Sequence, residues 1–272
     1  MTTTIGFGQY LPVFGERETN FRTIERIVAQ GAAADLLVLP ELGGTGYEFR
    51  DRAEVASLAE SFGEGPTSEV LRSLASGYNV TLVLGYPERA GDRFYNSCML
   101  ATPDGSLYNY RKIHLFSRET ELFTPGDAPP PVIQTPAGRV GLMICFDWFF
   151  PETARLLALS GAQIIAHPSN LVLSYCQRAM FARSVENGVF SITANRIGTE
   201  ERVAGRRLTF TGGSQILDPR GNTLASAPRD EEAVGLATVD VEASDNKQIT
   251  PYNHLLGSRR VDLYGLLTSA DA

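Results

Sequence analysis

The stretch GLMICFDWFF, residues 141–150, is an apolar run that ends on a thiol and an acid. Short apolar runs are typical of strands buried inside a sheet, and Cys145 and Asp147 come where this strand would end. Pro151 then suits the first turn of a helix that Gly161 would end. A cysteine in such a place is normally a small buried hydrophobic residue. The pattern alone therefore leaves the role of the thiol open.

Outward from this stretch, strand-like and helix-like segments alternate along the chain. Apolar runs predict buried strands at 36–40, 80–88 and 163–170. Helical periodicity or helix-end signals predict helices at 20–34, 151–161 and 175–188. No repeat or low-complexity linker divides the chain. We therefore predict a layered α/β fold with at least eight strands, built as a single domain over residues 1–272.

Composition argues against several classes of protein. The net charge of -7 disfavours nonspecific affinity for nucleic acid or an anionic membrane surface. No apolar run approaches the roughly 18 residues of a transmembrane helix, and the N-terminal stretch lacks the features of a secretory signal. The three cysteines are too few and too scattered for a disulfide framework or a zinc site. We expect a cytoplasmic protein with reduced thiols, without metal, membrane or nucleic-acid partners.

Three predicted strands end on chemically capable side chains. Glu41 follows LLVLP, Lys112 follows YNYR, and Cys145 follows GLMI. Functional groups gather at strand ends in α/β proteins because a rigid sheet holds the loops there. Alone, Glu41 is typical of a solvated loop acid and Lys112 of a surface charge. The combination is what indicates a site.

A thiol with a pKa near 8.5 needs a base or a nearby cation before it attacks a carbonyl carbon. Histidine is the usual base, and His114, His167 and His254 are available. None of the cysteines lies in a known cysteine-protease motif. A carboxylate serves equally if burial raises its pKa, and a lysine beside it can stabilise an oxyanion.

Three blocks carry a specific resemblance: LLVLPELGGTGY, YRKIHLFSRETELFTPGD and GLMICFDWFFPE. In order, spacing and flanking residues the chain resembles the nitrilase superfamily of carbon–nitrogen hydrolases, from about residue 3 to about residue 255. The resemblance implies a four-layer α-β-β-α sandwich without metal or organic cofactor. It also implies Glu41 as general base, Lys112 as oxyanion-stabilising cation and Cys145 as nucleophile. The backbone N–H of Phe146 would be the second oxyanion donor.

The family often adds a second glutamate between the lysine and cysteine blocks. Glu119 and Glu121 compete for this place in SRETELFTPGD. Counted back from the PGD at residues 125–127, Glu119 lies where many relatives place theirs, and seven residues after Lys112 leave room for a loop to fold back. We therefore favour Glu119, and the alternative makes both side chains solvated loop acids.

Four further residues are expected near the site. Tyr47 either lines the substrate pocket or packs as an ordinary tyrosine. Trp148 either forms a pocket wall or packs in the core. Asn170 either contacts the substrate or locks a loop. Asp147 is expected to hydrogen-bond loop amides and to fix the turn after the nucleophile.

The substrate is less constrained than the triad. Tyr47, Trp148 and Phe149 would make a largely apolar pocket, and no obvious arginine is placed beside the motif blocks to hold a carboxylate, although Arg178 and Arg183 could approach from the next helix. We therefore favour short aliphatic amides, cleaved to an acid and ammonia. The alternatives are an ω-amidase or N-carbamoyl amino acid amidohydrolase, then a nitrilase. From outside this class, a non-catalytic binding protein on the same fold stays open.

Family resemblance also implies a homodimer, paired through helices with the C-terminal tails reaching across. The tail over residues 252–272 is too apolar to be left free in water. Its alternative is to pack on its own domain. The apolar residues that would serve pairing on the helices are Leu156, Leu157, Leu159, Met180 and Phe181.

Overall fold

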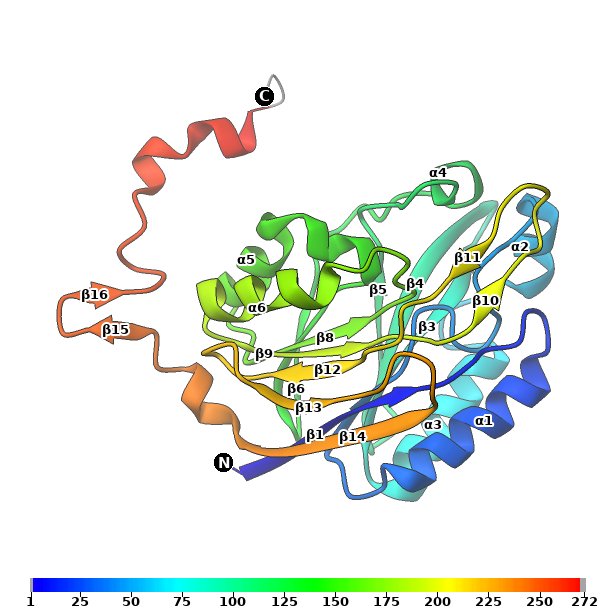
Figure 1. Ribbon diagram of the computed structural model, residues 1–272, viewed down its shortest axis with the longest axis horizontal. Coiled ribbons are helices and arrows are strands. Elements are labelled where there is room, and N and C mark those ends of the chain that lie inside the picture. Colours follow the sequence, from blue (N-terminus) through cyan, green and yellow to red (C-terminus); the bar gives the residue numbers. More distant parts are fainter. Residues whose placement is uncertain (1, 270–272) are drawn as a thin grey trace.

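The computed structural model describes residues 2–269 and contains two six-stranded sheets packed face to face (Figure 1). The first sheet has the order β14-β1-β2-β3-β4-β5: Ala233–Asp240, Thr2–Gln9, Leu36–Val38, Thr81–Ala90, Arg93–Ala101 and Leu107–Arg111. The second has the order β13-β12-β9-β8-β7-β6: Thr223–Ser226, Gln215–Leu217, Phe190–Ala194, Ile164–Pro168, Gly138–Leu142 and Val132–Thr135. Both sheets are therefore assembled from segments far apart in the chain.

The centre of each sheet is parallel and its flanks are antiparallel. Strands β1, β2 and β3 run parallel in the first sheet, and β7, β8 and β9 in the second. Parallel strands end at one edge of a sheet, so the loops that follow them gather there. This places the residues that follow β2, β7 and β8 at sheet edges suited to a site.

Helices cover the outer face of each sheet (Figure 1). Helices α1 (Arg17–Gln30) and α3 (Pro66–Tyr78) pack on the first sheet through residues such as Ile24, Ile27 and Leu71. Helices α5 (Pro151–Leu159) and α6 (Cys176–Asn187) cover the second. Between the sheets lies a continuous core that includes Phe7, Val38, Leu100, Leu142, Ala166 and Ile192. The predicted four-layer α-β-β-α sandwich is confirmed.

The helix signals in the sequence lie where they were expected. Pro151 is the first residue of α5, where a missing N–H has no cost, and Gly161 follows the helix with a φ of 89°. Two helices, α2 (Arg52–Leu58) and α3, lie between β2 and β3 in the chain. Pro66 begins α3.

Short elements complete the chain. They are α4 (Glu119–Leu122), the 3-10 turns η1 (Cys145–Phe149) and η2 (Val241–Ser244), and the hairpin of β10 (Thr199–Glu200) with β11 (Leu208–Thr209). Within residues 2–269, no helix has the length and apolar character that crossing a bilayer requires.

The C-terminal segment extends away from the sandwich (Figure 1). It contains a small hairpin, β15 (Gln248–Thr250) with β16 (Asn253–His254), then the turns η3 (Val261–Leu263) and η4 (Gly265–Thr268). Its apolar side chains Tyr252, Leu263 and Leu266 are exposed. In this structure most of the tail is therefore not packed on its own sandwich, and residues 270–272 lie outside the described part.

Candidate active site

The candidate residues follow strands of both sheets. Glu41 lies three residues beyond β2, and Lys112 directly follows β5 of the same sheet. Cys145 opens η1 beyond β7, and Asn170 lies beyond β8, both in the second sheet. The site therefore lies across the two sheets, and all four residues are buried.

The turn that carries the cysteine is held by Asp147. Cys145 has a φ of 39°, a left-handed conformation that non-glycine residues adopt rarely. The Asp147 carboxylate accepts hydrogen bonds from the backbone N–H of Ile144 at 2.8 Å and of His114 at 3.2 Å. It also accepts one from the hydroxyl of Tyr110 at 2.8 Å. The predicted bonds from Asp147 to loop amides are present, and they tie the end of β5 to the cysteine turn.

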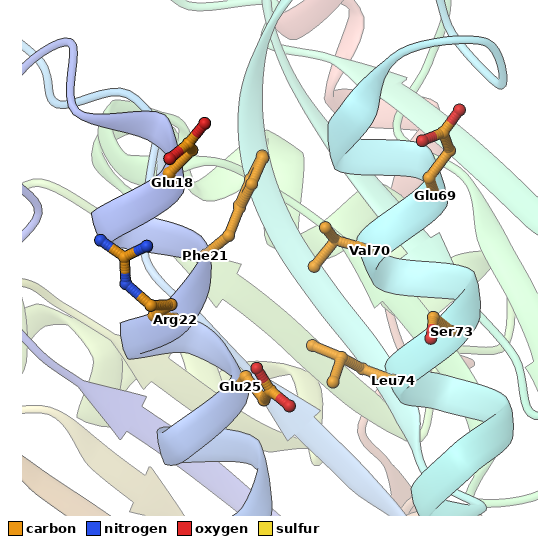
Figure 2. A pocket seen from close by; sticks show the side chains of 8 residues that line it. All are labelled: Glu18, Phe21, Arg22, Glu25, Glu69, Val70, Ser73 and Leu74. Carbon is orange, nitrogen blue, oxygen red and sulfur yellow. The ribbon is translucent and has the colours of Figure 1, made fainter.

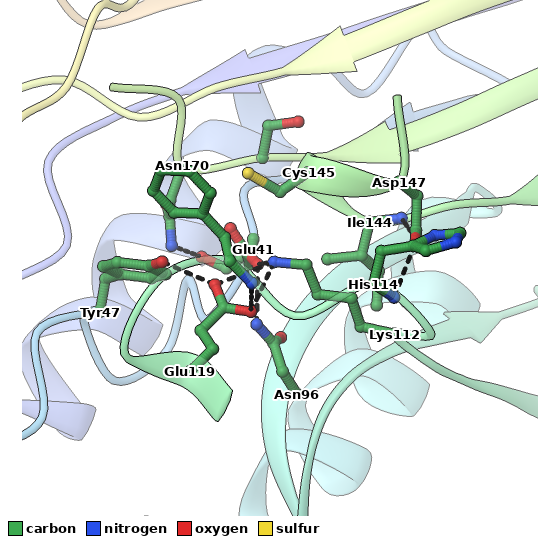
Figure 3. A network of polar contacts seen from close by, with 12 residues as sticks. Glu41, Tyr47, Asn96, Lys112, His114, Glu119, Ile144, Cys145, Asp147 and Asn170 are labelled. Carbon is green, nitrogen blue, oxygen red and sulfur yellow. Dashed lines mark hydrogen bonds and ion pairs between the residues drawn. The ribbon is translucent and has the colours of Figure 1, made fainter. Parts of the chain in front are cut away.

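A buried ion network lies beside the thiol. The Lys112 Nζ donates to Glu41 Oε1 at 2.7 Å and to the two carboxylate oxygens of Glu119 at 2.9 and 2.8 Å. Figure 3 shows the three side chains converging on one point near Cys145. Two carboxylates therefore share one ammonium in the buried space next to the sulfur.

Burial sets the protonation of this network. It raises the pKa of Glu41 above its usual value, although the charge of Lys112 opposes the shift. Burial alone would lower the pKa of Lys112, but the charges of Glu119 and Glu41 outweigh it and raise that pKa. Lys112 therefore stays a cation, while Glu41 is more basic than an exposed carboxylate. This is the property required of a general base.

The thiol is protonated at rest. Burial raises the pKa of Cys145 well above its usual value, and the charge of Glu41 raises it further. Lys112 and the backbone N–H of Asn170 act in the opposite direction but do not overcome these effects. A thiol in this state needs a base at the moment of attack. Glu41 has a second oxygen, Oε2, that is buried without a hydrogen-bond partner among the described residues.

The structure separates Glu119 from Glu121. Glu119 begins α4, is buried, and contacts Lys112. Glu121 is 64% exposed and pairs with Arg118 at 3.1 Å. Tyr47 joins the same network, because its hydroxyl donates to Glu119 Oε1 at 2.6 Å.

Two amides hold Glu41 in place. The side chain of Asn170 donates to the backbone oxygen of Glu41 at 2.9 Å, so it locks the loop after β2. Asn96, on β4, donates to Glu41 Oε1 at 2.7 Å. Sequence reasoning missed Asn96. No sequence signal marks it, because its place beside Lys112, whose backbone N–H bonds to the Asn96 carbonyl, is set by the pairing of β4 with β5.

A small pocket opens beside Cys145. Its lining is apolar apart from Cys145 and Asn170, and consists further of Phe116, Phe146, Trp148, Leu171, Val172 and Leu173. Trp148 is both buried and part of this wall. Phe149, in contrast, is exposed and does not line the pocket. Tyr47 lines a neighbouring cavity with Glu119.

The sequence model of the family described as carbon-nitrogen hydrolase matches residues 4–247. The chain belongs to this family. A nitrilase from Pyrococcus abyssi is 42% identical over 96% of this chain and 98% of its own length. The match covers nearly the whole of both proteins, so the likeness is not confined to the motif blocks.

Solved structures of other carbon–nitrogen hydrolases share the fold. The carbon-nitrogen hydrolase from Helicobacter pylori G27 superposes with a TM-score of 0.89, at 28% identity and 98% coverage of both chains. A mutant of the amidase from Nesterenkonia sp. AN1 gives a TM-score of 0.79, at 25% identity and coverage of 97% of this chain and 96% of its own. That structure shows the acetamide moiety of fluoroacetamide added covalently at its active-site cysteine.

Histidine does not serve the thiol in the part of this hydrolase that the structure describes. The ring of His167 lies 2.9 Å from the backbone oxygen of Cys145, and burial lowers its pKa to about 4. His114 Nδ1 lies 2.8 Å from Asp147. His254 lies in the exposed tail. Among the candidate bases considered from the sequence, Glu41 is the one that lies beside the thiol with a raised pKa.

A larger groove lies between α1 and α3 on the outer surface (Figure 2). Its floor is apolar, with Phe21, Val70 and Leu74, and acidic side chains such as Glu18 and Glu69 edge it. It holds neither a thiol nor a buried ion pair. This groove therefore offers no chemistry that a carbon–nitrogen hydrolase requires.

Proposed function

We propose that the protein hydrolyses small amides to a carboxylic acid and ammonia through a thioester on Cys145. The observation that carries this proposal is the buried Lys112 ammonium, held by Glu41 and Glu119, beside a protonated thiol at an apolar pocket. The arrangement supplies a nucleophile, a base of raised pKa and a cation in one place. The adduct at the active-site cysteine of the Nesterenkonia amidase supports the same role for Cys145.

The first half-reaction forms the thioester. Glu41 takes the proton from the Cys145 thiol as the sulfur attacks the amide carbon, because a free thiolate is disfavoured in this buried site. The charge of Lys112 and the backbone N–H of Phe146, the second residue of η1, stabilise the oxyanion. The carbon–nitrogen bond then breaks, and the departing ammonia takes the proton from Glu41.

The second half-reaction releases the acid. Glu41 removes a proton from water, whose oxygen attacks the thioester carbon. The carbon–sulfur bond breaks and the proton returns to the sulfur, which restores the thiol. Lys112 keeps its charge throughout, because both carboxylates raise its pKa. Glu119 holds the ammonium and so keeps it oriented towards the oxyanion.

The pocket favours short aliphatic acyl groups. It is small, and its walls are mostly apolar side chains. Its lining includes no charged side chain. A substrate with a free carboxylate would lose its hydration there without gaining an ionic partner. This favours simple amides over the ω-amides of dicarboxylates.

An ammonia-release assay tests the proposal. A panel of short amides, nitriles, ω-amides and N-carbamoyl amino acids should show the highest kcat/KM for short amides. No release from any amide would contradict the proposed function. Iodoacetamide gives a second measurement, because Cys145 lines a pocket and should react faster than Cys98 and Cys176, which are free thiols buried in the core. A free nucleophilic thiol also suits the reducing cytoplasm, which we propose as its compartment.

We also propose that residues 1–272 form one domain that pairs as a homodimer, with the tail from residue 252 in the contact. Leu156 and Leu159 on α5 and Phe181 on α6 are exposed, close to half of each side chain. The exposed tail adds further apolar area. Leu157 and Met180 are buried in the core, so they do not contribute to such a contact. Apolar patches of this kind usually mark interfaces.

A further inference from the structure

A hairpin outside the three motif blocks contacts the backbone of the loop that carries Tyr47. Strands β10 and β11 form this hairpin, and Glu200 at the end of β10 is buried. Its carboxylate accepts the backbone N–H of Tyr47 at 3.2 Å and that of Glu48 at 2.6 Å. Glu200 therefore fixes the backbone of the residue whose hydroxyl contacts Glu119.

The Glu200 carboxylate is itself held by a buried arginine. Arg196, buried in the same region, donates to Glu200 and also to the backbone oxygen of Pro12. The Arg196 guanidinium lies 4.0 Å from the ring centroid of Phe210. Phe210 in turn meets the ring of Tyr47 edge-on, with centroids 5.9 Å apart. Both the backbone and the ring of Tyr47 are thus positioned by residues beyond position 195.

We propose that Glu200 is a positioning residue for the hydrolysis, acting through the hydroxyl of Tyr47 on Glu119. The inference deepens the proposed function and rests on it. The chain of contacts is continuous: Glu200 accepts the Tyr47 N–H, the Tyr47 hydroxyl donates to Glu119 Oε1, and that same oxygen accepts from Lys112 at 2.9 Å.

Tyr47 affects Lys112 because both side chains donate to the same oxygen, Glu119 Oε1. A hydroxyl bonded to Glu119 Oε1 fixes the direction in which this carboxylate meets the ammonium. If Tyr47 moved away, Glu119 could rotate and draw Lys112 from the oxyanion. Effects of this kind lower kcat more than they raise KM, because the loss is felt in the transition state.

A double-mutant cycle tests the chain of contacts. We expect Tyr47→Phe to lower kcat/KM about tenfold, the loss typical of one hydrogen bond to a charged group. Glu200→Gln should lower it about fivefold, mainly through kcat. The double variant should lie within about twofold of Tyr47→Phe alone, because both changes remove the same interaction. Glu201→Gln, one residue along and 64% exposed, is the matched control and should leave activity unchanged.

Three results would overturn the inference: losses that multiply in the double variant, an unaffected Glu200→Gln, or an unaffected Tyr47→Phe. If Glu200→Gln does not fold because Arg196 is left unpaired, Phe210→Leu replaces it in the same cycle with the same expectation. If the wild type hydrolyses no amide, the proposed function fails. The cycle is then measured on the rate at which iodoacetamide alkylates Cys145, and a multiplicative result there overturns the inference separately.

Discussion

The site and the C-terminal tail depart from the usual distribution of side chains in opposite ways. The site buries three charges, with Glu41 and Lys112 at 0% exposure. The tail exposes apolar residues, with Leu266 at 77%. Charged side chains are almost never fully buried unless paired, and large exposed apolar patches usually mark contacts.

The two regions differ in what offsets the cost of their buried charges or exposed apolar side chains. Every charge of the site has an ionic partner within the chain, so the network is complete in one copy. Most of the tail's apolar side chains are exposed in one copy, and we propose that a second copy covers them. Changes in the site should therefore act on chemistry and leave assembly alone, and changes in the tail should do the reverse.

The largest effect is expected for Cys145→Ala. Removal of the proposed nucleophile should lower kcat by about 10⁴-fold or more. The thermal unfolding midpoint should stay close to that of the wild type because only a small side chain is lost. Ammonia release and circular dichroism measure the two quantities. Cys176→Ala, at another buried cysteine, is the control and should keep its activity. Full activity in Cys145→Ala would end the assignment.

Glu41→Gln should lower turnover by about 10²–10³-fold, the usual contribution of a general base. Removing the charge of Glu41 also removes one cause that raises the pKa of Cys145, so the thiol should still react with activated substrates. Mass spectrometry of the intact protein should then show an adduct on Cys145. Glu60→Gln, a buried carboxylate hydrogen-bonded to Thr67, is the control for losing such a group elsewhere. Unchanged turnover in Glu41→Gln would remove Glu41 from its role.

Glu119→Gln should lower kcat/KM at least about tenfold, because an amide cannot match the ionic contact with Lys112. Glu121→Gln is its neighbour and control, and should change little because that side chain is exposed. Steady-state kinetics on one short amide compares the two. A reversed order would transfer the role to Glu121, and two silent variants would leave Lys112 dependent on Glu41 alone.

The smallest effect on chemistry is expected for a chain that ends at His254. Its kcat per site should stay within about twofold of the full chain, because the site is complete without the tail. Light scattering should give about twice the 29.6 kDa chain mass for the full protein and a weaker dimer for the truncated one. Leu224→Ser, an exposed leucine on β13, is the control and should remain dimeric. A monomer at full length would contradict the proposal that a second copy covers the tail.

How far the sequence could predict this site depends on how each residue is positioned. Glu41 and Cys145 each follow an apolar run whose end is visible in the sequence, and Lys112 follows a predicted strand. The resemblance of the three blocks to the nitrilase superfamily is what linked these residues into one predicted site. Asn96 lies inside a strand, and its orientation towards Glu41 depends on the register of β4 with its neighbours. A period-2 pattern shows that two faces exist but does not give that register.

Glu200 could not be predicted for a different reason. Its contact with Tyr47 joins segments 153 residues apart, through backbone N–H groups that leave no mark in the side-chain pattern. The alternation of strands and helices was predictable because periodicity and helix-end signals are local, as at Pro151. The four-layer arrangement of the sheets was predicted from the family resemblance. The extended course of the tail was not, because composition indicates an apolar segment without showing where it lies.

The division of the site between two sheets has a practical consequence for engineering. Glu41 and Lys112 belong to one sheet and Cys145 to the other, so their separation depends on how side chains such as Val38 and Leu142 interlock between the sheets. Turnover would then report how well the two sheets are aligned. In a library of core variants, the most active ones would be those in which one sheet has shifted least relative to the other. A variant that resists heat but shifts the sheets could therefore be the least active. Stabilising substitutions are better sought on the outer face of α1 or α3, where a small shift does not change the alignment of the two sheets.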